Sequence, residues 1–70
     1  MVSPYQVEIS AERPATEQEE KTMGVSSITE KAKDRVRAYD RNDAAAKGKT
    51  LALKKWQKDK GWKNHSAVVM

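Results

Sequence analysis

The 70-residue chain contains no cysteine, no phenylalanine and only one histidine, His65. Without cysteine it can form neither a disulfide nor a thiolate metal site to support a small core. Nucleophilic catalysis needs a base held in place, and the single histidine lies in the C-terminal tail. No group of residues has the spacing of metal ligands either. We therefore expect a protein that is not an enzyme and that uses no metal or other cofactor.

Long apolar stretches are also missing. The longest, Ala67 to Met70, is far shorter than the roughly 18 residues that a transmembrane helix needs. The chain does not open with a charged stretch followed by an apolar one, as a secretory signal does. We therefore expect no membrane partner and an intracellular location, either cytoplasmic or associated with a nucleoid or nucleus.

Large aliphatic side chains are scarce. Leucine, isoleucine and valine together account for ten of the 70 residues, and the nine alanines each bury little area. That content is below the level of roughly 20 per cent under which chains tend to be disordered. A thin core is therefore expected, and part of the chain is predicted to order only on a partner or in a homo-oligomer.

Charge, in contrast, is abundant and unevenly distributed. Residues 1–30 hold two basic residues against six glutamates, whereas residues 44–65 hold seven lysines against Asp59 alone. Like charges on one helix repel, so these lysines need an external partner to neutralise them. Phosphate groups are the most common such partner, and lysine contacts to them give affinity with little sequence reading.

The residue patterns predict a mainly α fold: a small two-helix hairpin with an extended or strand-like N-terminal arm. The arm is suggested by Tyr5, Val7 and Ile9, which alternate with polar residues as in a half-buried strand. Over Tyr5 to Ser10 this strand, followed by helices, is similar in outline to ribbon-helix-helix repressors. Residues 15–23 lack the apolar stripe that dimers of that family need, so no family is assigned.

Two helices are expected after this arm, over about residues 28–41 and 44–60. Ser27 and Glu30 have the spacing of a capping box, and apolar residues then recur at steps of four, four and three, at Ile28, Ala32, Val36 and Tyr39. The second helix would turn one face to the core, formed by Ala45, Gly48, Ala52 and Trp56. Between the arm and the first helix, Thr16 could cap a marginal helix with Glu19 in reach.

These elements divide the chain into three parts. Residues 1–24 are predicted to be an acidic, largely flexible arm and linker, residues 25–63 the basic helical hairpin, and residues 64–70 a short C-terminal tail. Trp62 lies beyond Gly61, where a helix commonly ends. Three interpretations stay open for it: a clasp over the helix end, a base-stacking platform, and an anchor in a protein partner.

Together these features predict a small non-enzymatic nucleic-acid-binding accessory or regulatory protein, with DNA slightly favoured over RNA. Its predicted binding residues are Lys47, Lys54, Lys55, Lys58, Lys60, Trp62 and Lys63. The alternative is a protein-interaction module, an inhibitor or a small subunit of a larger assembly. In that case the basic helix docks on an acidic protein surface, residues 5–10 extend a partner's sheet, and the module orders on binding.

Overall fold

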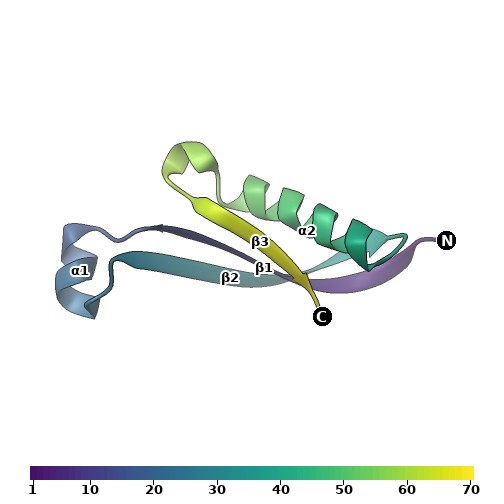
Figure 1. Cartoon of the computed structure of the whole chain (residues 1–70), viewed down its shortest axis with the longest axis horizontal. Coiled ribbons are helices and arrows are strands. Elements are labelled where there is room, and N and C mark those ends of the chain that lie inside the picture. The colour runs from purple at the N-terminus through teal and green to yellow at the C-terminus, as the bar shows by residue number, and fades with distance from the viewer.

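The computed structural model describes residues 1–70 as a three-stranded antiparallel sheet with one long helix packed on it (Figure 1). In chain order the elements are β1 (Ser3–Pro14), α1 (Glu17–Met23), β2 (Ser27–Ala38), α2 (Arg41–Lys55), the 3-10 turn η1 (Lys58–Lys60) and β3 (Lys63–Val69). The strand order is β2-β1-β3. The prediction of a mainly α fold with a helical hairpin is therefore wrong.

The predicted N-terminal arm is the central strand of the sheet. The alternation at Tyr5, Val7 and Ile9 does form a strand, but β1 pairs with β2 along its whole length and with β3 from Val7 to Glu12. From Gln6 onwards both edges of this segment are occupied within the chain. Residues 5–10 therefore cannot extend a partner's sheet, and they do not form the intermolecular ribbon of a ribbon-helix-helix dimer.

The segment predicted as the first helix is strand β2. Ile28, Ala32 and Val36 are four residues apart, and a step of four places residues on one side of a helix and also on one face of a strand. These residues form a strand, because a single strand such as β1 is stable only with a hydrogen-bonded neighbour. In the sheet Ile9 of β1 pairs with Ala32 of β2. Tyr39, which the helical pattern placed on the buried stripe, lies outside β2 and is 68% exposed.

Helix α2 begins and ends earlier than predicted. The Asp40 side chain accepts a hydrogen bond from the Asp43 backbone N–H and caps the first turn. Ala44, Gly48 and Ala52 are buried against the sheet, at helical steps of four. A Cβ at Gly48 would lie 2.9 Å from the Ala67 Cβ, so glycine is what allows the helix to approach β3 this closely.

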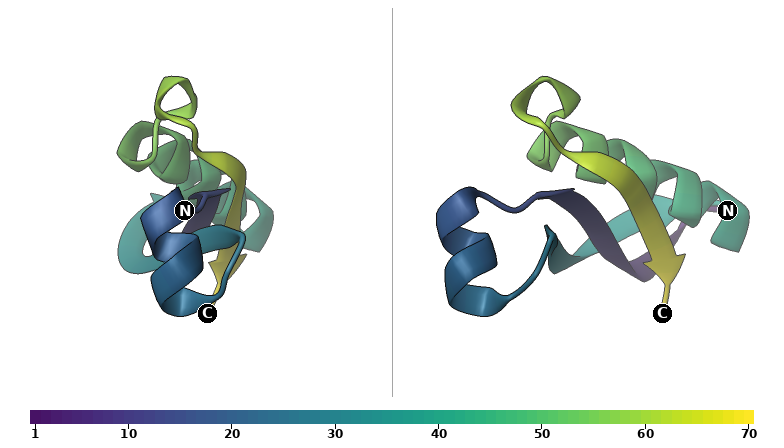
Figure 2. Two further views of the ribbon diagram at one scale, coloured as in Figure 1. Left: turned by 90° about the vertical axis from the view of Figure 1, so that its left-hand side faces the viewer. Right: turned by 60° about the vertical axis from the view of Figure 1, so that its left-hand side comes forward.

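The core is small and lies between α2 and one face of the sheet. Its eight buried residues are Val7, Ile9, Ala11, Val36, Ala38, Ala44, Ala52 and Trp56. No helix lies over the opposite face of the sheet, which is open (Figures 1 and 2). Neither α1 nor α2 has the length and apolar character needed to cross a bilayer.

The molecule is elongated, with extents of 50 × 22 × 13 Å. The β1–β2 hairpin projects beyond α2 and carries α1 at its tip, far from both termini (Figure 1). The capping box that forms in this protein is at Thr16 and Glu19, which confirms the cap expected there. No residue of α1 is buried, so the tip adds nothing to the core.

Candidate functional site

A β-bulge at the start of β3 shapes the most concave part of the surface. Ser66 faces Ser10 and Lys63 faces Glu12, so β3 has one residue more than β1 between these pairs. Asn64 has a φ of 54°, in the left-handed region that asparagine tolerates better than most residues. Its side-chain amide donates to the Glu12 carboxylate. The bulge therefore fixes the backbone where the strand begins.

The same bulge directs His65 towards the end of α2. The His65 Nε2 atom lies 2.5 Å from the Trp56 carbonyl oxygen. A carbonyl oxygen can only accept, so Nε2 carries the hydrogen and donates it. His65 is thus held in place by a backbone contact rather than lying free in a tail.

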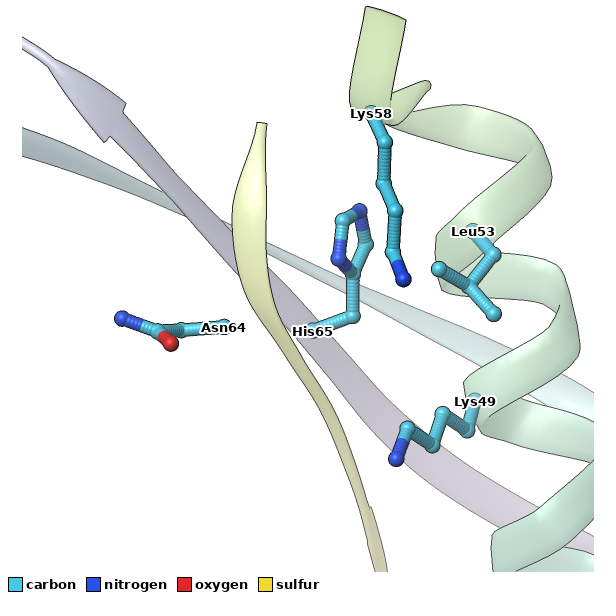
Figure 3. A pocket seen from close by; sticks show the side chains of 5 residues that line it. All are labelled: Lys49, Leu53, Lys58, Asn64 and His65. Carbon is cyan, nitrogen blue, oxygen red and sulfur yellow. The ribbon is translucent and has the colours of Figure 1, made fainter. Parts of the chain in front are cut away.

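A pocket of about 480 Å³ opens between α2, η1 and β3, and its lining is basic. Its walls are Lys49 and Leu53 from α2, Lys58 from η1, and Asn64 and His65 from β3 (Figure 3). No carboxylate lines it. Two ammonium groups around an open cavity that no carboxylate lines favour an anion, and phosphate has the matching charge.

Two tryptophans close the core beside this pocket. Trp56 is 4% exposed, which confirms its prediction as a core residue, and its Nε1–H donates to Glu30 Oε2 at 2.9 Å. The Trp62 ring centroid lies 5.9 Å from that of Trp56, and the Arg13 guanidinium lies 5.7 Å from the Trp62 ring centroid. Trp62 is half-buried in the position that the clasp interpretation describes, which leaves part of its surface for a partner.

The predicted lysines do not share a single helix face. Lys47 donates to the Arg37 carbonyl oxygen at 2.6 Å, so it lies on the flank of α2 next to β2. Lys54, two helical turns later, lies on the same flank, and the Lys55 ammonium lies 5.7 Å from the Trp56 ring centroid. Because α2 ends at Lys55, the remaining three are outside the helix: Lys58 and Lys60 in η1 and Lys63 at the start of β3.

Few of the basic side chains are neutralised within the molecule. There are two ion pairs: Arg13 with Glu19 at 2.8 Å, and Lys47 with Asp43 at 3.4 Å. The Asp43 pKa is lowered first by the hydrogen bond from the Tyr39 backbone N–H and then by Lys47. The glutamates of the N-terminal half therefore leave the lysines of the pocket and of η1 without an internal counter-charge.

No protein-family model, curated protein or solved structure matches this chain. No group of three or more histidine, aspartate or glutamate side chains is placed to hold a metal ion. The geometry and charge of the pocket and its surroundings are therefore what indicate a function.

Of the four polar residues that line this pocket, sequence reasoning identified only Lys58 and missed three: Lys49, Asn64 and His65. Lys49 was visible as one of the lysines of the basic segment, but the helix predicted over about residues 44–60 did not place it beside Lys58. Asn64 and His65 carry no local signal, because a bulge arises from how two strands pair. The exposed cations of β2 were also missed, although Lys31, Lys33, Arg35 and Arg37 alternate with other residues in the sequence.

Proposed function

We propose that this protein is a small, non-enzymatic nucleic-acid-binding accessory or regulatory protein. The observation that carries the proposal is the pocket between α2, η1 and β3, which is lined by Lys49, Lys58 and His65 and by no acid. Three further lysines outside the pocket, at positions 54, 60 and 63, also make no ion pair and add to the positive charge of α2, η1 and the start of β3. Lysine contacts to phosphate read neither base nor sugar, so DNA and RNA are both ligands for this surface.

Binding of this kind has a specific dependence on salt. Each phosphate that a lysine neutralises releases condensed counterions, so the logarithm of the binding constant falls linearly with the logarithm of the salt concentration. We expect the affinity for a fluorescein-labelled DNA duplex to fall steeply between about 50 and 200 mM salt. The measurement is fluorescence anisotropy. An affinity that is the same at both salt concentrations would contradict the proposal.

A quadruple glutamine variant at Lys54, Lys58, Lys60 and Lys63 tests the surface itself. We expect it to bind duplex DNA about tenfold or more weakly, and to reduce the slope against salt by about one for each phosphate that is no longer neutralised. The matched control lowers the net charge by the same amount on α1, at the tip of the hairpin: Lys21→Glu, Thr22→Glu and Met23→Glu. If the control variant bound duplex DNA as weakly as the glutamine variant does, only the net charge of the protein would matter for binding, and the proposed surface would not.

The second candidate is a module that docks on an acidic protein surface. The free outer edge of β3 favours it, because Val68 is 61% exposed and Met70 is 56% exposed beside that edge. Affinity purification with and without nuclease treatment separates the two functions. Partners held through nucleic acid are lost after nuclease, whereas a directly bound acidic protein is retained.

A further inference from the structure

The open face of the sheet carries a row of four cations along β2. Val36 and Ala38 are buried under α2, and side chains at successive positions of a strand point to opposite faces. The odd-numbered positions of β2 therefore point away from the helix. These positions hold Lys31, Lys33, Arg35 and Arg37, which are all exposed and make no ion pair.

The neighbouring strand does little to neutralise this row. Directly across from it on β1 lie Ser10, Glu8, Gln6 and Pro4, of which only Glu8 is charged. On the far side β2 is an edge strand with no neighbour. A charged edge strand is also one way in which proteins prevent sheets from joining edge to edge, so self-association has to be measured as well.

The spacing of the row suits a regular array of phosphates. Alternate residues of a strand lie about 6.7 Å apart, so the row spans about 20 Å. One strand of a duplex advances about 3.4 Å per phosphate along the helix axis, so the row extends along roughly six phosphates. Since β2 is paired with β1 along its whole length, the four side chains start from a rigid backbone.

The open face lacks the aromatic residues that single-strand binders use. Sheets that bind single-stranded RNA stack unpaired bases on two or three aromatic side chains. The residues of β1 and β3 on the open face include Gln6, Ser10, Ser66 and Val68, and none is aromatic. Tyr39, which follows β2, is the one exposed aromatic residue of the chain. The surface is thus equipped for backbone contacts rather than for base stacking.

We propose that the open face is a second nucleic-acid-contacting surface, in which the β2 row binds the phosphate backbone of a duplex in preference to a single strand. This inference rests on the proposed function and adds to it a second surface and the form of the ligand. The pocket lies on the side of the sheet that α2 covers, and the row lies on the other side. The two surfaces can therefore be altered independently.

The test compares the glutamine variant of all four row residues, Lys31, Lys33, Arg35 and Arg37, with the wild-type protein. Anisotropy is measured on a 20-base-pair duplex and on a single strand of the same length, each at two salt concentrations. We expect the wild type to prefer the duplex. The row variant should bind the duplex about tenfold or more weakly, with its slope against salt reduced by about two to four.

Two controls accompany the row variant. The tip variant at positions 21–23 has the same change in net charge and should keep most of the duplex affinity. Tyr39→Ala should leave duplex binding unchanged. Circular dichroism confirms that each variant is folded, and light scattering measures its self-association.

The remaining results separate the alternatives. If the row variant binds the duplex like wild type and instead self-associates, the row only protects the edge and the proposal is overturned. A preference for single strands that Tyr39→Ala abolishes would overturn it too. If the lysine variant at positions 54, 58, 60 and 63 loses binding while the row variant does not, the proposed function stands and this inference fails. If the wild type binds neither ligand, the proposed function fails as well.

Discussion

At the scale of single residues, Arg13 connects parts of the molecule that are distant in sequence. It projects from β1, where its two terminal nitrogens donate to the two carboxylate oxygens of Glu19 at 2.8 and 2.9 Å. The same guanidinium lies over the ring of Trp62. A bidentate arginine–carboxylate pair fixes orientation as well as distance. Arg13 therefore holds α1 in a defined direction relative to β1.

This pair predicts a pH dependence of the tip. The hydrogen bonds from Arg13, helped by the Thr16 backbone N–H, lower the Glu19 pKa from 4.5 to about 2. Because the pKa is lower in the folded state, the stabilisation is present above about pH 4.5 and is lost as the pH falls towards about 2. We expect an NMR titration of the Glu19 carboxyl carbon to show the low value, and Arg13→Gln to move it back towards 4.5. A Glu19 that titrates near 4.5 in the wild type would contradict this.

At the scale of elements, β2 shows how one pattern can satisfy two periods. Ile28, Ala32 and Val36 fit one side of a helix of residues 28–41 as well as one face of a strand, and only positions off that helical stripe distinguish a helix from a strand. Ala38 is such a position: it lies off the stripe of a helix but is 0% exposed in the sheet. The alternation of Lys31, Lys33 and Arg35 also fits a strand, because it places all three on one face.

Ala38→Glu tests the strand directly. In the sheet it would bury an unpaired carboxylate, so we expect the free energy of unfolding to fall by about 3 kcal/mol or more. The matched control is Ala46→Glu on the exposed side of α2, which should change it by about 0.5 kcal/mol or less. Urea unfolding followed by tryptophan fluorescence measures both. Equal effects of the two substitutions would contradict the strand assignment.

At the scale of the whole molecule, the core and the projecting tip are separate. Seven of the eight core residues belong to β1, β2 or α2, and the eighth is Trp56, which directly follows α2. None of them lies between Thr16 and Val25. The Ala15 N–H donates to the Ser26 carbonyl oxygen at 3.1 Å, so the two strands are still paired where the tip begins. The tip is therefore an appendage of the hairpin rather than a part that holds the sheet together.

Replacing residues 16–25 by Asn-Gly should consequently leave a folded protein. Asn-Gly forms the two-residue turn that best matches the twist of paired strands. The variant lacks the Arg13–Glu19 pair but keeps every core residue, so we expect a cooperative transition with a melting temperature close to that of the wild type. Thermal melting by circular dichroism measures this. Loss of a cooperative transition would show that the tip is needed for folding.

Part of the fold and of the site was predictable from local patterns. The alternation at Val7 and Ile9 identified a strand, and the small residues Gly48 and Ala52 identified the face of α2 that approaches a neighbour closely. Trp56 was correctly placed in the core. The pairing of the strands was not predictable, because hydrogen bonds between strands join residues that are far apart in sequence. The pocket was missed for the same reason, since His65 reaches it through a bulge between β1 and β3.

The sequence by itself determined the composition of this protein and the local preferences of its segments: few large apolar residues, unbalanced lysines, a cap at Thr16 and alternation in the first strand. The tertiary structure alone decided that residues 27–38 form a strand and that Lys49, Lys58 and His65 surround one pocket. The physical reason is that a step of four residues suits a helix and a strand alike. The choice between them depends on the hydrogen bonds that β1 needs from its neighbours, which no local window contains.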